Sequence, residues 1–164
     1  MDLIFFENGW LVFILVTVVN ALVLNFRSRR FVENKPELKE GYQKFIVGML
    51  FYGNIPWIIV GIGNLTGMTS SLFEYFSPGQ MNPVVLVFHA SLLVLWGLSV
   101  YWIYFRGGAE FIESHPGLFT KSGFLGATEL TATDIKRWFP VMLLGGVVAV
   151  VMMWTNGDVI PAID

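Results

Sequence analysis

Four long stretches without a charged side chain alternate with polar segments along the chain. They cover residues 8–26, 45–73, 75–105 and 138–157. A helix needs about 20 apolar residues to cross the hydrocarbon core of a bilayer, and each stretch is close to that length or longer. Strands of membrane barrels are only about ten residues long and alternate in hydropathy, which excludes that class. The pattern therefore predicts four transmembrane helices.

The predicted fold is an all-α integral membrane protein, one domain over residues 1–164, with its spans in an up-and-down bundle. We expect these spans at about 9–26, 43–65, 83–105 and 138–155. The intervening polar segments on one side of the membrane are residues 27–42 and 106–137.

The longer of these two segments carries signals of its own. Gly107 and Gly108 are expected to end the third span, and residues 109–115 to form a short interfacial helix. Thr133 is expected to cap the fourth helix, with Asp134 in its first turn, because a hydroxyl and then an acid favour a helix start.

Composition supports the membrane prediction and excludes several functions. The chain is 55% hydrophobic and 13% charged, whereas a soluble domain carries about 25% charged residues. It has no cysteine, which excludes disulfides, thiolate catalysis and cysteine metal sites. The net charge of −2 leaves no basic stripe for a nucleic-acid partner.

The basic residues predict the orientation. All ten lysines and arginines fall in 27–44 and 106–137, whereas the opposite side carries only acids: Asp2, Glu7, Glu74, Asp158 and Asp164. Segments rich in lysine and arginine stay in the cytoplasm. We therefore expect both termini on the non-cytoplasmic side of a cytoplasmic or inner membrane. Acids precede the first apolar run and no small-residue cleavage site follows it, so we expect an uncleaved span.

His89 is the sharpest candidate for a functional residue, because it is the one histidine inside an apolar stretch. It could contact a solute or an ion, or ligate a metal or haem. The alternative is a structural hydrogen bond to Asn20, to Asn54 or to a carbonyl freed by Pro56. A b-type haem needs two axial ligands, and no second intramembrane histidine exists. We therefore expect no cofactor and no metal.

Four other residues inside the spans are candidates for a ligand or polar cavity. Asn54 lies next to Pro56, and broken helices at membrane depth often line binding sites; alternatively its amide only satisfies a kink. Asn20 has the same two interpretations. Trp57 and Trp96 lie deeper than the interfacial belt that tryptophan prefers. They could line a lipid or quinone groove, although core packing is the simpler interpretation.

Two further patterns are interpreted as structural. Glu113 and His115 are two apart, which is wrong for one helix face, so solvation in a loop explains His115 better than metal binding does. Gly145 and Ala149 are four apart on the fourth span, and such small residues favour close helix contact.

No charged side chain lies inside the apolar part of a span, since Lys44 stands only at the edge of the second one, and no catalytic frame is visible. Charges inside the membrane usually mark ion-coupled transport. The leading hypothesis is therefore a non-enzymatic small integral subunit or scaffold of a membrane complex, with the lipid bilayer and either further copies or other membrane subunits as partners. One alternative is a homo-oligomeric transporter or channel for a neutral or weakly polar solute. Another is a redox or cofactor-binding membrane subunit.

Overall fold

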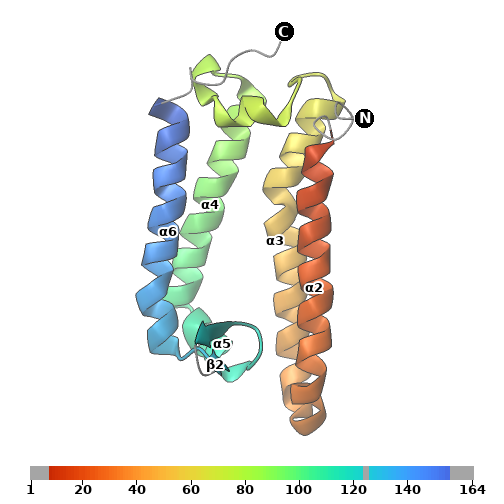
Figure 1. Cartoon of the computed structure of the whole chain (residues 1–164), viewed down its shortest axis with the longest axis vertical. Coiled ribbons are helices and arrows are strands. Elements are labelled where there is room, and N and C mark those ends of the chain that lie inside the picture. Colours follow the sequence, from red (N-terminus) through yellow and green to blue (C-terminus); the bar gives the residue numbers. More distant parts are fainter. Residues whose placement is uncertain (1–7, 124–125, 156–164) are drawn as a thin grey trace.

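The computed structural model describes residues 8–123 and 126–155, with side chains described outside 121–128. Four long helices run side by side along the long axis of the molecule (Figure 1), each antiparallel to the next in the chain. They are α2 (Gly9–Asn34), α3 (Lys39–Leu65), α4 (Pro83–Phe105) and α6 (Ala132–Thr155). Each contains an apolar segment long enough to cross a membrane. The predicted all-α four-span fold is confirmed.

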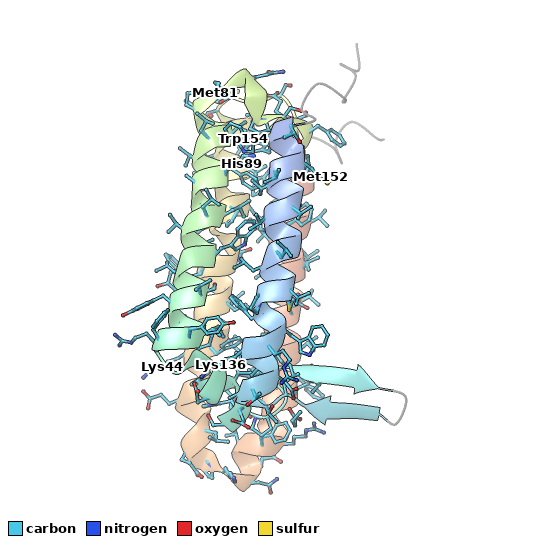
Figure 2. All side chains as sticks on the ribbon, turned by 90° about the vertical axis from the view of Figure 1, so that its left-hand side faces the viewer. Lys44, Met81, His89, Lys136, Met152 and Trp154 are labelled. Carbon is cyan, nitrogen blue, oxygen red and sulfur yellow. The ribbon has the colours of Figure 1, made fainter. Side chains whose placement is uncertain are left out.

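Short elements connect the long helices at the two ends of the molecule. At one end, called the η2 end, lie the 3-10 turns η2 (Leu72–Phe76) and η3 (Pro78–Gln80). At the other, called the hairpin end, lie η1 (Pro36–Leu38), α5 (Gly108–Ser114) and the strands β1 (Thr120–Gly123) and β2 (Gly126–Glu129). The two strands pair antiparallel, with Thr120 opposite Glu129. In Figure 2 this hairpin points sideways, away from the helix axes.

The helices pack in chain order. α2 packs most extensively against α3, α3 packs against α4, and α4 packs more loosely against α6 (Figures 1 and 2). Buried apolar residues form two clusters. One gathers around Val60 and Tyr75 towards the η2 end, and the other around Ile103 and Ala109 towards the hairpin end.

The first polar segment, expected as a loop over 27–42, is mostly helical. α2 continues to Asn34, and α3 begins at Lys39. Hydropathy marks where a helix leaves the apolar layer, whereas arginine and glutamate are good helix formers in water. The chain turns at Lys35, whose φ of −140° is non-helical, because the residue before a proline is sterically excluded from the α region.

The second polar segment, expected over 106–137, differs from the prediction in two places. The short helix α5 lies within one residue of its predicted position, but the hairpin at Thr120–Glu129 was not predicted. α6 begins at Ala132, two residues before the start predicted from a Thr133 cap. Its cap is Thr131, whose hydroxyl accepts from the Asp134 N–H at 3.1 Å while Asp134 accepts from the Thr131 N–H. This reciprocal box takes the role predicted for Thr133.

Tryptophan rings lying against glycines bring the helices together. A β-carbon built on Gly61 of α3 would come within 2.8 Å of the Trp10 ring of α2, and one on Gly146 of α6 within 2.8 Å of the Trp96 ring of α4. Gly145 meets nothing within 4 Å, and Ala149 is exposed. Inside the bundle α6 therefore packs through Gly146, and not through the neighbouring Gly145 that the sequence indicated.

Candidate functional site

His89 lies near the start of α4 and is only 3% exposed. Its Nε2 is 2.9 Å from the carbonyl oxygen of Tyr75 in η2. A carbonyl can only accept, so Nε2 carries the proton and Nδ1 presents a lone pair. Nδ1 is buried and has no hydrogen-bond partner among the described residues. His89 thus binds η2, as the structural interpretation expected, but its partner is none of the three candidates predicted.

The His89 ring also contacts α6. Its centroid is 5.8 Å from that of Trp154 in an edge-on arrangement, and Figure 2 shows the two side chains close together at the η2 end. The Phe88 ring lies 5.4 Å from the His89 ring on the same helix. His89 therefore connects three elements, α4, η2 and α6, through one hydrogen bond and an aromatic contact.

Tyr75 of η2 is fully buried. A β-carbon on Gly63 would overlap its hydroxyl, so only glycine at 63 leaves room for it. The hydroxyl lies 3.3 Å from the Thr69 Oγ1 and 3.4 Å from the Val60 carbonyl. Burial raises the pKa of the Tyr75 phenol, an effect that the Thr69 hydrogen bond opposes. The apolar run Leu72–Phe76 was the signal for this insertion.

Asn54 of α3 is 8% exposed. Its Nδ2 donates to the Leu50 carbonyl at 2.8 Å, one turn back in the same helix. The carbonyl that Pro56 leaves without its usual donor belongs to Tyr52, so Asn54 does not satisfy the break at the proline. Its Oδ1 is buried with no hydrogen-bond partner in the described part of the chain.

The remaining candidates have packing roles or face outwards. The Trp57 ring stacks on Phe13 of α2 with centroids 3.8 Å apart and lies 6.3 Å from Phe88. Trp96 covers Gly146. Asn20 is exposed on α2. Both tryptophans therefore pack between helices, which is the simpler of the two interpretations.

The structure brings only some of the five candidates together. His89 and Trp57 belong to one aromatic cluster around Phe88, whereas no hydrogen bond or ring contact within residues 8–120 and 129–155 joins Asn20, Asn54 or Trp96 to it. A cavity of about 290 Å³ opens near the cluster. It is lined by Asn8, Trp10, Asn64, Leu65, Thr69 and Ser70, and so by none of the five.

A second buried cluster, at the hairpin end, was missed. His115 was expected to be solvated, but it is 8% exposed, and a β-carbon on Gly41 of α3 would overlap its ring. Its Nδ1 lies 2.8 Å from the Phe111 carbonyl. Tyr42 contacts the same ring edge-on and donates its hydroxyl proton to the Pro116 carbonyl at 2.7 Å. The sequence signal for this cluster was weak, because Gly41 and Tyr42 lie more than 70 residues before His115 in the chain.

The chemistry available is limited. No group of three or more histidine, aspartate or glutamate side chains that could hold a metal occurs among the described residues. The polar atoms at membrane depth that stay unpartnered there are two acceptors, Nδ1 of His89 and Oδ1 of Asn54. Such atoms can accept a hydrogen bond from a neutral donor. Comparisons with protein-family models, curated proteins and solved structures find no match for the chain.

Proposed function

We propose that this protein is a non-enzymatic integral subunit or scaffold of a membrane complex, which assembles through helix contacts with further copies or with other membrane subunits. The observation that carries the proposal is the exposure of α6. None of its most apolar 18 residues is buried inside the chain, against 28% of the corresponding window in α3.

Apolar exposure alone is normal in lipid, so the residue types on the open face matter more. Gly145 and Ala149 are both exposed on α6, one helical turn apart, and Gly145 has open space above it. Small residues let helix backbones approach closely, and close packing is a main source of helix association in a bilayer. This face supports contact with a further transmembrane helix.

The interior of the bundle is more typical of a scaffold protein than of an enzyme. Its glycines accommodate tryptophan and tyrosine rings rather than a substrate, and the apolar stretches of the spans contain no charged side chain. Membrane enzymes and ion-coupled carriers place ionisable groups at membrane depth. The bundle uses its inner surfaces for helix packing, which fits a structural role.

The proposed location is the cytoplasmic or inner membrane, with both termini on the non-cytoplasmic side. In the structure α2 begins and α6 ends at the same end of the bundle, and the hairpin end carries the basic segments (Figures 1 and 2). The retention of basic segments in the cytoplasm supports this orientation. The acids Asp2, Glu7, Asp158 and Asp164, used in the same argument, lie outside the described residues.

Native mass spectrometry of the protein gently extracted from its own membrane tests the assembly. We expect a homo-oligomer or a complex with other polypeptides. The variant Gly145→Leu/Ala149→Leu should lower the assembled fraction at least about tenfold, because each bulky side chain separates the helix backbones. The matched control is Val147→Leu/Val151→Leu, which changes exposed positions elsewhere on α6 and should leave assembly unchanged.

A monomer without other polypeptides, in a protein whose melting temperature is intact, would contradict the proposal. Equal losses in the test and control variants would show that α6 does not use the Gly145 face. A spectrum with visible absorption bands would instead favour a redox or cofactor-binding subunit.

The second candidate function is a homo-oligomeric transporter or channel for a neutral or weakly polar solute. The two buried acceptors without partners, on His89 and Asn54, favour it. They lie on different helices and line neither of two hollows found on the described surface, so an oligomer would have to complete the path. Replacing each by alanine distinguishes the roles: loss of solute flux at unchanged melting temperature supports transport, and loss of stability alone excludes it.

A further inference from the structure

Three arginines follow the apolar part of α2 without a break in the helix. Arg27, Arg29 and Arg30, here called the arginine patch, come directly after Phe26, the last residue of the first uncharged stretch. α2 continues to Asn34. At 1.5 Å per residue, the Cα atoms of the three arginines lie within about 6 Å of the end of the apolar segment, measured along the helix axis. The patch therefore lies at the depth of lipid headgroups.

All three side chains lie against neighbouring groups. The guanidinium carbon of Arg29 is 6.0 Å from the centroid of the Phe26 ring. Arg27 Nη2 lies 3.5 Å from the Thr120 hydroxyl oxygen of β1, a long hydrogen bond. Arg30 lies over the Phe31 ring, 4.5 Å from its centroid, and a β-carbon on Gly117 would be only 2.6 Å from that ring. The second polar segment thus positions residues at the end of the first helix.

The patch keeps its positive charge. Lys44 is paired with Glu40 and Lys136 with Glu110, but within residues 8–120 and 129–155 no carboxylate forms an ion pair with a patch arginine. Glu33 lies on the same helix, and Glu129 accepts a hydrogen bond from the Gly117 N–H at 2.9 Å. An anion at the patch would therefore not have to displace an acid.

Large apolar side chains are exposed next to the patch. Phe26 is 72% exposed and Phe119 46% exposed. Phe119 lies beside Thr120 in the chain and contacts Phe45 of α3 edge-on, with centroids 5.9 Å apart. Positive groups that lie beside exposed aromatic rings fit a molecule that has both a phosphate and hydrocarbon chains.

We propose that the arginine patch, with Phe26 and Phe119, is a binding site for an anionic phospholipid. Arg27 and Arg30, three apart on one face of α2, bind the phosphate oxygens with paired hydrogen bonds, as arginine does more readily than lysine. Arg29, two residues from Arg27, adds its positive charge from a neighbouring face, while the two rings contact the upper acyl chains. Inorganic phosphate offers the first interaction but not the second, so the site prefers the lipid. The assignment is independent of the assembly proposed above.

Native mass spectrometry of the full chain in detergent, titrated with phosphatidylglycerol or phosphatidylcholine, tests the site. Each basic residue near an anionic headgroup contributes about fivefold in affinity. The variant Arg27→Gln/Arg29→Gln/Arg30→Gln should therefore lose at least about tenfold in retained phosphatidylglycerol, and retention of phosphatidylcholine should not change. The charge-matched control Lys35→Gln/Lys39→Gln/Arg106→Gln removes three exposed basic residues outside the patch and should retain the lipid.

Equal losses in the two triple variants would overturn the proposal, because they would show diffuse attraction to the whole basic end. Displacement of the lipid by millimolar inorganic phosphate would assign the site to a free anion and overturn it as well. If the triple variant does not fold, Arg29→Gln/Arg30→Gln replaces it, since this variant keeps the Arg27–Thr120 contact. Unchanged lipid retention in that double variant would also overturn the proposal.

Discussion

The two ends of α3 hold the neighbouring segments by the same kind of contact. At the η2 end the Tyr75 hydroxyl lies against Gly63, and at the hairpin end the His115 ring lies against Gly41. In both places a loop inserts an aromatic side chain onto a glycine of the same helix. α3 consequently anchors a connecting segment at each of its ends.

The two ends differ in their hydrogen bonds. At the hairpin end the short bonds of His115 to Phe111 and of Tyr42 to Pro116 are 2.8 and 2.7 Å long. At the η2 end the Tyr75 hydroxyl has only contacts of 3.3 and 3.4 Å, and Nδ1 of His89 has no partner among the described residues. Shape therefore dominates in holding the Tyr75 hydroxyl, although the Tyr75 carbonyl is bonded to His89 Nε2 at 2.9 Å. Hydrogen bonding of the inserted polar atoms contributes more at the hairpin end.

The largest expected effect comes from filling the space at Gly63. Gly63→Ala places a methyl group against Tyr75, Thr69 and Val84, inside a fully buried cluster. We expect a loss of about 3 kcal/mol in the free energy of unfolding, as for severe overpacking, measured by thermal melting in detergent. Gly97→Ala on α4, where nothing lies within 4 Å, is the control and should not destabilise. A neutral Gly63→Ala would contradict the dominance of shape at this end.

Removing the two tyrosine hydroxyls tests the difference in hydrogen bonding. Tyr42→Phe breaks the 2.7 Å bond to Pro116 and should cost about 1.5 kcal/mol, because the hydroxyl and its partner are largely shielded from water. Tyr75→Phe loses only long contacts and should cost less than half as much. Denaturant titrations of both variants measure the two losses. Equal costs would remove the distinction between the ends.

A pair of adjacent glycines extends the comparison to the middle of the bundle. Gly146→Ala pushes a methyl group into the Trp96 ring, whereas Gly145→Ala enters open space. Alanine favours a helix over glycine by up to about 1 kcal/mol, so Gly145→Ala should be neutral or stabilising. Gly146→Ala should be about 1 kcal/mol less stable than Gly145→Ala. Melting temperatures that rank the other way would contradict the placement of Trp96.

The smallest expected effect concerns the exposed pair at the hairpin end. The hydrogen bond from Lys136 holds the pKa of Glu110 below its usual value of 4.5. A carboxyl with a lowered pKa in the folded state stabilises the fold above about pH 4.5, and this contribution disappears as the pH falls. Glu110→Gln should therefore reduce the loss of stability that accompanies a fall in pH below about 4.5. The effect should be small because the pair is exposed. An unchanged acid limb would show that the pair contributes nothing.

The long helices could be predicted because the apolar length that makes a helix span a membrane is a property of each segment by itself. Twenty apolar residues specify a span without reference to the rest of the chain, so the limits of α4 were predicted to the residue. Helix ends outside the apolar layer depend on local signals, and Pro36 and Thr131 set them more than hydropathy did. His89, Trp57 and Trp96 were identified as ligand or cavity candidates, with structural roles as the alternative, because a polar or large aromatic side chain at that depth needs an explanation. Asn20 was identified on the same grounds but is exposed.

The contacts between segments could not be predicted. Nothing near Tyr75 in the sequence names Gly63 as its partner, and nothing near His115 names Gly41. The rings fit there because the antiparallel helices bring those residues to the same level. The hairpin at Thr120–Glu129 was missed for a related reason, as its short strands lack the alternation that marks a strand.

The glycine contacts of α3 also bear on how the protein is made. Trp10, which covers Gly61, is synthesised before α3, so this contact can form once the first two helices are in the bilayer. Tyr75 and His115 leave the ribosome later than the glycines they cover. Helices that insert first and pack afterwards would leave Gly63 and Gly41 open during that interval. A nascent chain that stops after α4 would carry a closed η2 end and an open surface at Gly41.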